Sequence, residues 1–470
     1  MSLDRIRVLK TGGRRLLAGL IAALACLTGC SEAPTRVESA SLVLEGCRVI
    51  TMRSSDVLEG VTIVVNADTI AAMGSDGTLL VPDSVPRLDC KGDFVLPGLT
   101  DAHVHIGHPT ELISYLLSGV TTVFNLGGDH IDLFSGDRLD VLQLQDSVAA
   151  GRYPGPTIYS AGQALDGDPP TGPYQLGLAS AEEAAEAVRQ QFERGFDFIK
   201  VYDGLDETVH TAIVTAATEL NLPVFGHVPE AIGVQGTLES GQKVITHVEE
   251  FYPVLDTAQD LETAVRSLAT AVARAGVVVI PNGGFIQGLI RQLEDLDREL
   301  GAPGVEYLAP AVRVWWDPQY NYYVNRDDPG AFLAQNRHRN GWIQQLVPAL
   351  HSAGVLLLSG SDASIPVALP GPSLHGELAA LVESGLSPFE AIATATTNVD
   401  SFMAQAAPGA RPFGTVRVGA RADLIILAEN PLIAIGTLEA PKGLVVRGEW
   451  MDVSELRRIR DRETAAFRRR

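Results

Sequence analysis

The chain has 470 residues, of which 46% are hydrophobic, and its formal net charge at pH 7 is −21. This length and composition allow one large buried core or two moderate ones. The acidic balance argues against a nucleic-acid partner, because phosphate backbones attract basic proteins, and it gives no strong attraction to anionic lipids. The sequence therefore predicts an acidic, globular protein.

The first 29 residues have the pattern of an export signal. Basic residues precede the apolar run LLAGLIAALACL (16–27), which is too short for a permanent membrane span. We therefore predict a cleaved signal peptide over residues 1–29. The following LTGC (27–30) resembles the lipobox of bacterial lipoproteins, which implies lipidation of Cys30, a polar tether over 30–40, and an exported protein tethered to a membrane at the periplasm, outer membrane or cell surface. An ordinary signal peptide is the alternative.

The two flanks of the chain have the texture of antiparallel strands. Short β-branched and apolar runs, broken by turn residues, fill 41–93 and return in 413–450. We expect these flanks to meet in one small β-sandwich. Cys47 and Cys90 lie in the first flank, and the sequence leaves open whether they form a disulfide or stay free thiols.

The middle of the chain, 94–412, alternates apolar strand candidates with stretches of helical periodicity. Eight such strand-helix units are what a (β/α)8 barrel of the TIM type needs, and such a barrel places its chemistry at the carboxyl ends of its strands. The predicted fold is therefore α/β, with the barrel inserted in the β-sandwich. The strand candidates are FVLPGLTDAHVHIG (94–107), VTTVFNLG (120–127), TIYSAG (157–162), DFIKVYDG (197–204), PVFGHV (223–228), VITHVEE (244–250), VVVIPNGG (277–284) and VLLLSGSDAS (355–364).

Two segments depart from this rhythm. Residues 287–345, between the seventh and eighth strand candidates, hold a cluster of aromatic residues that forms either a packed helical excursion or a lid over the substrate pocket. The tail 451–470 is rich in arginine, and we expect a solvated helix that could touch lipid head groups. The clustered aromatic residues are Trp315, Trp316, Tyr320, Tyr322 and Tyr323.

Candidate metal ligands stand at the ends of five predicted strands. His103 and His105 are two residues apart, so a strand would point both rings to one side. An isolated His-x-His pair also occurs by chance, but the other candidates fall at the same ends of their strands and would converge on one mouth of the barrel. The full set is His103, His105, Lys200, His227, His247 and Asp362.

The ordered set of motifs resembles the amidohydrolase superfamily of metal-dependent hydrolases. The resemblance covers about 41–450, and within the superfamily it is strongest to the branch of imidazolonepropionase-like proteins and binuclear Xaa-Pro dipeptidases. It rests on PGLTDAHVHIG (97–107), FDFIKVYDG (196–204), VFGHV (224–228), VITHVEE (244–250), LSGSDAS (358–364), HGELAALVESGLSPFEAIATATTN (375–398) and FGTVRVGARADLIILAENP (413–431).

The resemblance implies two divalent metal ions per chain. Zinc is the default because it accepts imidazole nitrogen and carboxylate oxygen, although manganese, cobalt and iron are alternatives. In the family the lysine after strand four reacts with carbon dioxide, which requires a neutral amine. We assign His103, His105 and Asp362 to one ion, His227 and His247 to the other, and carboxylated Lys200 to both.

The expected reaction is cleavage of an amide bond in a small substrate, such as a dipeptide of the Xaa-Pro type or an N-acyl amino acid. A hydroxide that bridges the metals would be the nucleophile. Asp362 would accept its proton and deliver it to the departing amine. Tyr252, or alternatively Tyr202, would donate a hydrogen bond to the oxyanion.

Several questions stay open at this stage. A deaminase or a cyclic amide or lactone hydrolase with one metal shares the His-x-His pair and Asp362 but does not need Lys200. A non-catalytic lipoprotein that binds metal or another ligand is a third hypothesis, and a homo-oligomer is compatible with all three. His108 is either a rim histidine or a residue that orients a ligand or substrate, and His375 has either a structural role or a substrate contact. The sequence offers no partner for the other histidines, which are His130, His210, His338 and His351.

Overall fold

The computed structural model describes residues 35–131 and 138–467. The predicted signal peptide and Cys30 lie outside the described residues, so lipidation stays a prediction. Of the predicted tether, strand β1 (Thr35–Arg36) pairs in parallel with β5 (Leu79–Leu80). Within the described ranges, no helix has the length and apolar character that a membrane crossing requires.

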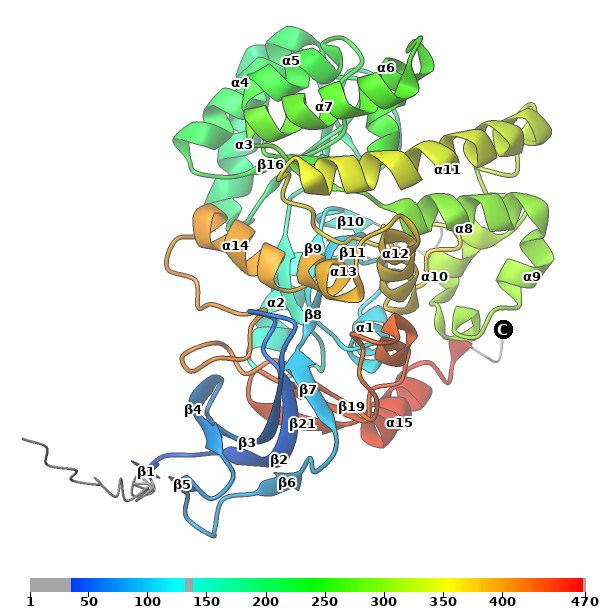
Figure 1. Ribbon diagram of the computed structural model, residues 1–470. Coiled ribbons are helices and arrows are strands. Elements are labelled where there is room, and N and C mark those ends of the chain that lie inside the picture. Colours follow the sequence, from blue (N-terminus) through cyan, green and yellow to red (C-terminus); the bar gives the residue numbers. More distant parts are fainter. Residues whose placement is uncertain (1–34, 132–137, 468–470) are drawn as a thin grey trace, which may run out of the picture.

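The two flanks meet in one small β domain, and their strands are hydrogen-bonded into one sheet. Its eight-stranded sheet joins β2 (Leu42–Ile50), β3 (Val57–Asn66), β4 (Thr69–Ser75), β6 (Arg87–Asp89) and β7 (Phe94–Pro97) to β19 (Leu424–Leu427), β20 (Gly443–Val446) and β21 (Glu449–Asp452) (Figure 1). Strand β7 connects the flanks, because it pairs in parallel with β2 and antiparallel with β19. The buried thiols of Cys47 and Cys90 are free. They hydrogen-bond to each other, which together with burial raises the pKa of Cys47.

The first predicted barrel strand is in fact two strands that belong to different sheets. Phe94–Pro97 is strand β7 of the β domain, and the barrel begins with β8 (Leu99–Val104). Gly98 separates them at a point where the backbone runs close to Thr121, since a β-carbon at Gly98 would clash with the Thr121 side chain. The apolar pattern is continuous across Gly98, so it could not reveal this division.

The predicted (β/α)8 barrel is confirmed. Seven of its parallel strands are β8, β9 (Val120–Asn125), β12 (Thr157–Ser160), β15 (Ile199–Val201), β16 (Val224–Gly226), β17 (Val244–Thr246) and β18 (Val278–Ile280). The eighth segment, 355–359, closes the ring through a bridge from Leu357 to Val279 and a hydrogen bond of 2.8 Å from the Ala102 amide to the Ser359 carbonyl. A parallel bridge between Ala161 and Phe198 joins β12 to β15.

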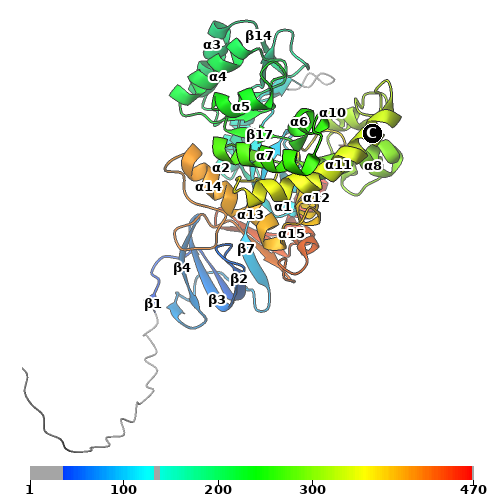
Figure 2. The same ribbon diagram turned by 45° about the horizontal axis from the view of Figure 1, so that its top comes forward.

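Helices cover the outside of the barrel, and in both views α3, α4 and α5 lie on the side away from the β domain (Figure 2). Three of the long helices begin at side-chain caps, in which Ser180, Asp206 and Asp260 accept a hydrogen bond from the backbone three residues on. The helices are α1 (Glu111–Leu117), α2 (Val141–Ala149), α3 (Ala181–Arg194), α4 (Glu207–Glu219), α5 (Gly233–Ser240), α6 (Tyr252–Asp256), α7 (Leu261–Ala275), α11 (Pro329–Ser352), α12 (Pro372–Glu383), α13 (Pro388–Thr394) and α14 (Thr397–Ala406).

The aromatic excursion is a folded unit over the carboxyl ends of the strands. It contains α8 (Gly283–Glu294), α9 (Leu296–Leu300), α10 (Pro310–Arg313) and the short 3-10 helix η3 (Val314–Trp316). The Trp316 side chain is buried, and its indole nitrogen donates a hydrogen bond of 3.5 Å to the Ser364 carbonyl. This contact ties the excursion to the loop after the eighth strand.

The arginine-rich tail is not a fully solvated helix. Helix α15 (Val453–Glu463) buries Val453 and Leu456 in a cluster with residues of α1 and β20. Arg460 donates a hydrogen bond of 2.9 Å to the Tyr307 hydroxyl. The apolar positions of α15 therefore dock the tail on the barrel, a packing that its high charge concealed.

Candidate active site

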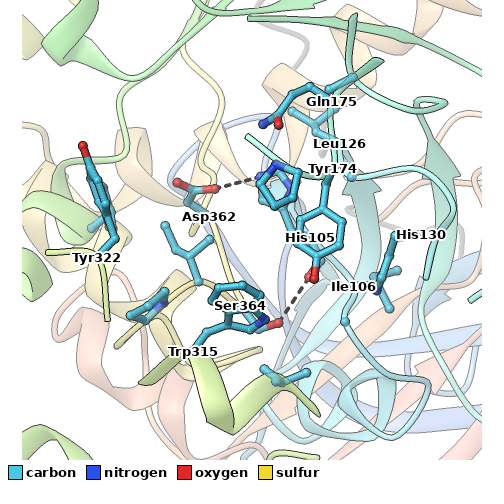
Figure 3. A pocket seen from close by; sticks show the side chains of 18 of the residues that line it. His105, Ile106, Leu126, His130, Tyr174, Gln175, Trp315, Tyr322, Asp362 and Ser364 are labelled. Carbon is cyan, nitrogen blue, oxygen red and sulfur yellow. Dashed lines mark hydrogen bonds and ion pairs between the residues drawn. The ribbon is translucent and has the colours of Figure 1, made fainter. Parts of the chain in front are cut away.

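Three predicted ligands converge at the end of β8 and the eighth strand. The Nε2 atoms of His103 and His105 lie 3.2 Å apart, and His103 Nε2 lies 3.2 Å from Asp362 Oδ1. His105 Nε2 lies 3.0 Å from the same oxygen (Figure 3). The alternation of β8 directs both rings to one side, and the Asp362 amide donates to the His103 carbonyl at 2.8 Å. The three donor atoms surround one point, which is the arrangement that a divalent ion requires.

His103 is oriented by a residue that sequence analysis did not select. Asn282, at the end of β18, places Oδ1 3.3 Å from His103 Nδ1 and donates from Nδ2 to the Gly360 carbonyl at 2.8 Å. The amide oxygen can only accept, so the Nδ1 proton is on His103 and its Nε2 is free to bind a metal. Burial lowers the pKa of His103 well below its usual value, which keeps the ring neutral.

The other two predicted histidines lie beside this group. The His247 ring centroid is 4.9 Å from that of His103 and 5.0 Å from that of His227. His247 Nε2 is 3.9 Å from Asp362 Oδ2, and its buried Nδ1 has no hydrogen-bond partner among the described residues. Burial lowers the pKa of His247 as well, so its ring is neutral and can act as a ligand.

His227 is held by two carboxylates. Its Nδ1 lies 2.8 Å from Asp203 Oδ1 and 2.9 Å from Glu250 Oε1, and these three residues form a second group whose donor atoms lie within 4.8 Å of one another. Burial and Lys200 lower the pKa of His227, but the two carboxylates outweigh them and raise it to about 9. Because Nδ1 is engaged in this way, a metal would bind His227 through Nε2, and the ring would lose its proton on binding. Asp203 and Glu250 each follow a predicted ligand by three residues, and that spacing was the one signal for them in the sequence.

Lys200 is fully buried among these groups. Its Nζ donates a hydrogen bond of 3.2 Å to Thr246 Oγ1 and lies 5.3 Å from the centre of the Tyr202 ring. Burial lowers the pKa of Lys200 to about 8, although Asp362, Glu250 and Asp203 act in the opposite direction. A substantial fraction of the amine is therefore neutral near pH 8, which is the form that can react with carbon dioxide.

A cavity of about 520 Å³ opens onto these groups. The excursion supplies much of its wall, and the rings of the aromatic cluster line the cavity with the exception of the buried Trp316. His130 also faces this cavity (Figure 3). The cavity is lined by four predicted ligands, His105, His227, His247 and Asp362, and by aromatic side chains that include Tyr174, Tyr202, Phe285, Trp315, Tyr320, Tyr322 and Tyr323.

Tyr252 is not part of this site. Its ring packs against Trp342 at 5.5 Å and lies under the Arg339 guanidinium at 4.8 Å, away from the residues that line the cavity. Tyr252 begins helix α6, which turns the side chain into the core, and a sequence motif could not show this turn. Tyr202 does line the cavity, stacked on His227 at 4.4 Å, and replaces Tyr252 as the tyrosine nearest to the predicted ligands.

The remaining histidines lie outside the ligand group. His108 contacts Thr110 at 2.9 Å, His210 contacts Gln242 at 3.0 Å and His351 contacts Glu390 at 3.2 Å. His338 packs on Trp342. His375 is buried in α12, and burial lowers its pKa to about 4. The contacts of His108, His210, His338 and His351 indicate structural roles.

Comparison with known proteins agrees with this geometry. A family model described as "Amidohydrolase family" matches residues 94–451. An ochratoxinase of Aspergillus niger is 24% identical over 473 residues, with 88% of this chain and 85% of that protein covered. Among solved structures, a bottromycin amidohydrolase superposes with a TM-score of 0.70, at 23% identity and with 90% of each chain covered. A Xaa-Pro dipeptidase with bound methionine superposes with a TM-score of 0.66, at 19% identity and with 87% of this chain and 99% of that chain covered.

The barrel and its cluster of histidines and carboxylates define a hydrolase that acts on carbon–nitrogen bonds. The chain belongs to the amidohydrolase family. Members of this family generally use divalent metals, and the donor set fits such ions, because two imidazole nitrogens and a carboxylate oxygen converge on one point.

Proposed function

We propose that the protein hydrolyses the amide bond of a small substrate, such as a dipeptide of the Xaa-Pro type or an N-acyl amino acid, with two divalent metal ions and a carboxylated Lys200. The observation that carries the proposal is the convergence of His103, His105 and Asp362 within 3.2 Å, beside His247, His227 and a buried lysine. Lys200 with its carbamate would hold both ions. His227 and His247 would complete the site of the second.

The ions, most simply zinc, would polarise the amide carbonyl and lower the pKa of water when bound. Asp362 is placed to accept a proton from the attacking water and to return it to the amide nitrogen as the carbon–nitrogen bond breaks. Burial raises the pKa of Asp362, but the hydrogen bond with His105 and the positive charge of the nearby Lys200 outweigh it and hold the pKa below its ordinary value. Asp362 is therefore ionised and ready to act as a base at neutral pH.

Hydrolysis of a pooled library of dipeptides and N-acyl amino acids tests this proposal. The full chain, supplied with Zn²⁺ and bicarbonate, is compared with its Lys200→Ala variant. We expect amino acids to be released by the wild type alone. Release by both proteins would remove Lys200 from the mechanism. Release by neither would move the search to cyclic amides, lactones and deamination substrates.

A deaminase or cyclic amide hydrolase with one metal is the second candidate. The group of His103, His105 and Asp362 is compact without Lys200, while the His227 Nδ1 is already engaged by Asp203 and Glu250. The number of zinc ions per chain, measured by mass spectrometry of the metal, separates the two. Two zinc ions per chain in the wild type and fewer than two in Lys200→Ala favour the binuclear amidase. One zinc ion per chain in both proteins favours the alternative.

We also propose that the mature protein is a lipoprotein tethered through Cys30. Metabolic labelling of the full chain with a palmitate analogue, compared with Cys30→Ser, tests this. The label should appear on the wild type and be absent from the variant, and equal labelling of both would contradict the assignment.

A further inference from the structure

Three aromatic side chains of the excursion form one wall of the cavity. The ring centroid of Phe285, in α8, lies 6.3 Å from that of the predicted ligand His247. Tyr323 contacts Phe285 with ring centroids 6.0 Å apart, and Tyr322 contacts Tyr323 at 5.6 Å. We name Phe285, Tyr322 and Tyr323 the Tyr322 wall, and all three line the cavity. This aromatic surface begins beside the predicted ligands and ends at solvent, where Tyr322 is 65% exposed.

A second aromatic wall is built from segments that are distant in the chain. The ring centroid of Tyr174 lies 5.7 Å from that of His130 and 6.3 Å from that of Trp315, which belongs to η3. All three side chains line the cavity, and we name them the Tyr174 wall. The cavity therefore has two separate groups of contacting rings.

The predicted ligands lie between these two walls. In Figure 3, Tyr322 lies on one side of His105 and Asp362, and Tyr174 lies on the other side. A peptide-like amide is planar and almost always trans, so its acyl and amine substituents leave the scissile bond in opposite directions. An amide whose carbonyl lies at the predicted ligands therefore directs one substituent toward each wall.

The size of the cavity favours a substrate that reaches both walls. Its volume of about 520 Å³ is in the range of about 300–1,000 Å³ that is typical of sites for drug-sized ligands. A substrate with only a methyl group on each side of the amide would leave both walls in contact with water. A buried aromatic group removes about 150–250 Å² of surface from water, which is the main source of its binding free energy.

From these observations we infer that the enzyme prefers amides that carry an apolar ring on both sides of the scissile bond. One ring packs on the Tyr322 wall and the other on the Tyr174 wall. The inference rests on the proposed amidase function and narrows it within both proposed substrate types. Arylacetyl derivatives of aromatic amino acids are preferred among the N-acyl amino acids. Dipeptides with an aromatic first residue are preferred among the Xaa-Pro type, in which proline supplies the second ring.

Four N-acyl amino acids test the inference as a matched set. N-Phenylacetyl-L-phenylalanine has a ring on both sides, N-phenylacetyl-L-alanine and N-acetyl-L-phenylalanine have one ring each, and N-acetyl-L-alanine has none. All four carry the same amide and the same carboxylate, so differences among them report the rings. We expect each ring to raise the kcat/KM of the zinc-loaded full chain at least about tenfold. Equal cleavage of the four compounds, or a gain from one ring only, would overturn the inference and leave the amidase proposal standing.

Variants of the two walls test whether each wall receives its own ring. Tyr322→Ala and Trp315→Ala each remove one aromatic side chain, and each should lower the gain from one substrate ring at least about threefold. The two variants should affect different rings. Phe192→Ala, which removes an exposed ring of α3 outside the cavity, is the control and should leave both gains in place. A wall variant that changes neither gain, or two wall variants that lower the same gain, would overturn the inference.

Binding separates failure of the inference from failure of the proposed function. If none of the four compounds is hydrolysed, isothermal titration calorimetry of the zinc-loaded full chain measures their affinities. At least about tenfold tighter binding of N-phenylacetyl-L-phenylalanine than of either compound with one ring supports the inference, while the amidase proposal fails for these substrates. Equal affinity for the compounds with one ring and with two rings overturns the inference.

Discussion

The two donor groups of the site differ in how their charges are balanced. In the group of His103, His105 and Asp362, the facing atoms are a carboxylate oxygen and two imidazole nitrogens that no other described side chain engages on that side. In the group of Asp203, His227 and Glu250, the imidazole lies between two carboxylates and its Nδ1 is satisfied by both. The first group therefore has the arrangement of a metal site, and the second is an internal ion-pair network.

This difference separates ligands from the residues that position ligands. A buried metal-ligating atom whose lone pair faces only other lone pairs raises the free energy of the folded protein unless a metal binds there. A histidine held at one nitrogen by carboxylates has its ring direction set and presents the other nitrogen. We therefore expect changes in the first group to abolish chemistry and changes around Asp203 and Glu250 to weaken it.

The largest expected effect is that of Asp362→Asn. The amide keeps the shape but cannot accept a proton, so kcat/KM should fall by about 10³-fold. Steady-state hydrolysis of the best amide found in the library measures the change. Asp83→Asn, the same exchange at an exposed position of the β domain, is the matched control and should leave kcat/KM unchanged. A loss below about tenfold in Asp362→Asn would contradict its role as the base.

A smaller effect is expected from Asn282→Gly. The variant removes the acceptor that orients His103, and zinc affinity should fall by about 10- to 100-fold in a competition assay with a chelator. Asn282 has φ 54°, a conformation that glycine adopts without strain, so the loss reports the side chain and not the backbone. Asn282→Asp keeps an acceptor for Nδ1 and should retain affinity. Equal loss in both variants would contradict the orientation argument.

The pH dependence of metal loading tests Lys200. Burial lowers the pKa of the amine to about 8, so below that value the neutral fraction rises with pH and above it the fraction levels off. At constant dissolved carbon dioxide, the rate at which the metal-free chain regains activity should rise about tenfold from pH 6 to pH 7 and flatten above pH 8. Lys200→Met should show no dependence on carbon dioxide. A rate that still rises tenfold between pH 9 and pH 10 would show an unperturbed lysine.

The smallest effect is expected from Asp203→Asn. Glu250 still holds His227 in this variant, so two zinc ions per chain and activity within about threefold of the wild type are expected, because exposed or shared charge pairs contribute little. The double variant Asp203→Asn/Glu250→Gln frees the ring, and the second ion should then be lost on dialysis. Loss of that ion in Asp203→Asn alone would indicate that Asp203 is a metal ligand. The distinction between a ligand group and a positioning group would then be wrong.

Sequence by itself determined the barrel and the ends of its strands. The eight apolar runs are short and separated by helical periodicity, and the period of two in a strand places His103 and His105 on one side. Because carboxyl ends of parallel strands meet at one mouth, the positions of Lys200, His227, His247 and Asp362 followed from the same pattern. The acidic character of the protein and its resemblance to one family also follow from the sequence alone.

Only the tertiary structure decided which neighbours these residues have. Asn282 reaches the site from a strand end that the sequence analysis did not single out, and Asp203 and Glu250 are paired through His227. Tyr252 turned into the core, and Phe94–Pro97 joined the β domain, for the same reason. A local pattern determines the face on which a side chain lies, whereas its partners depend on contacts between segments that are distant in the chain.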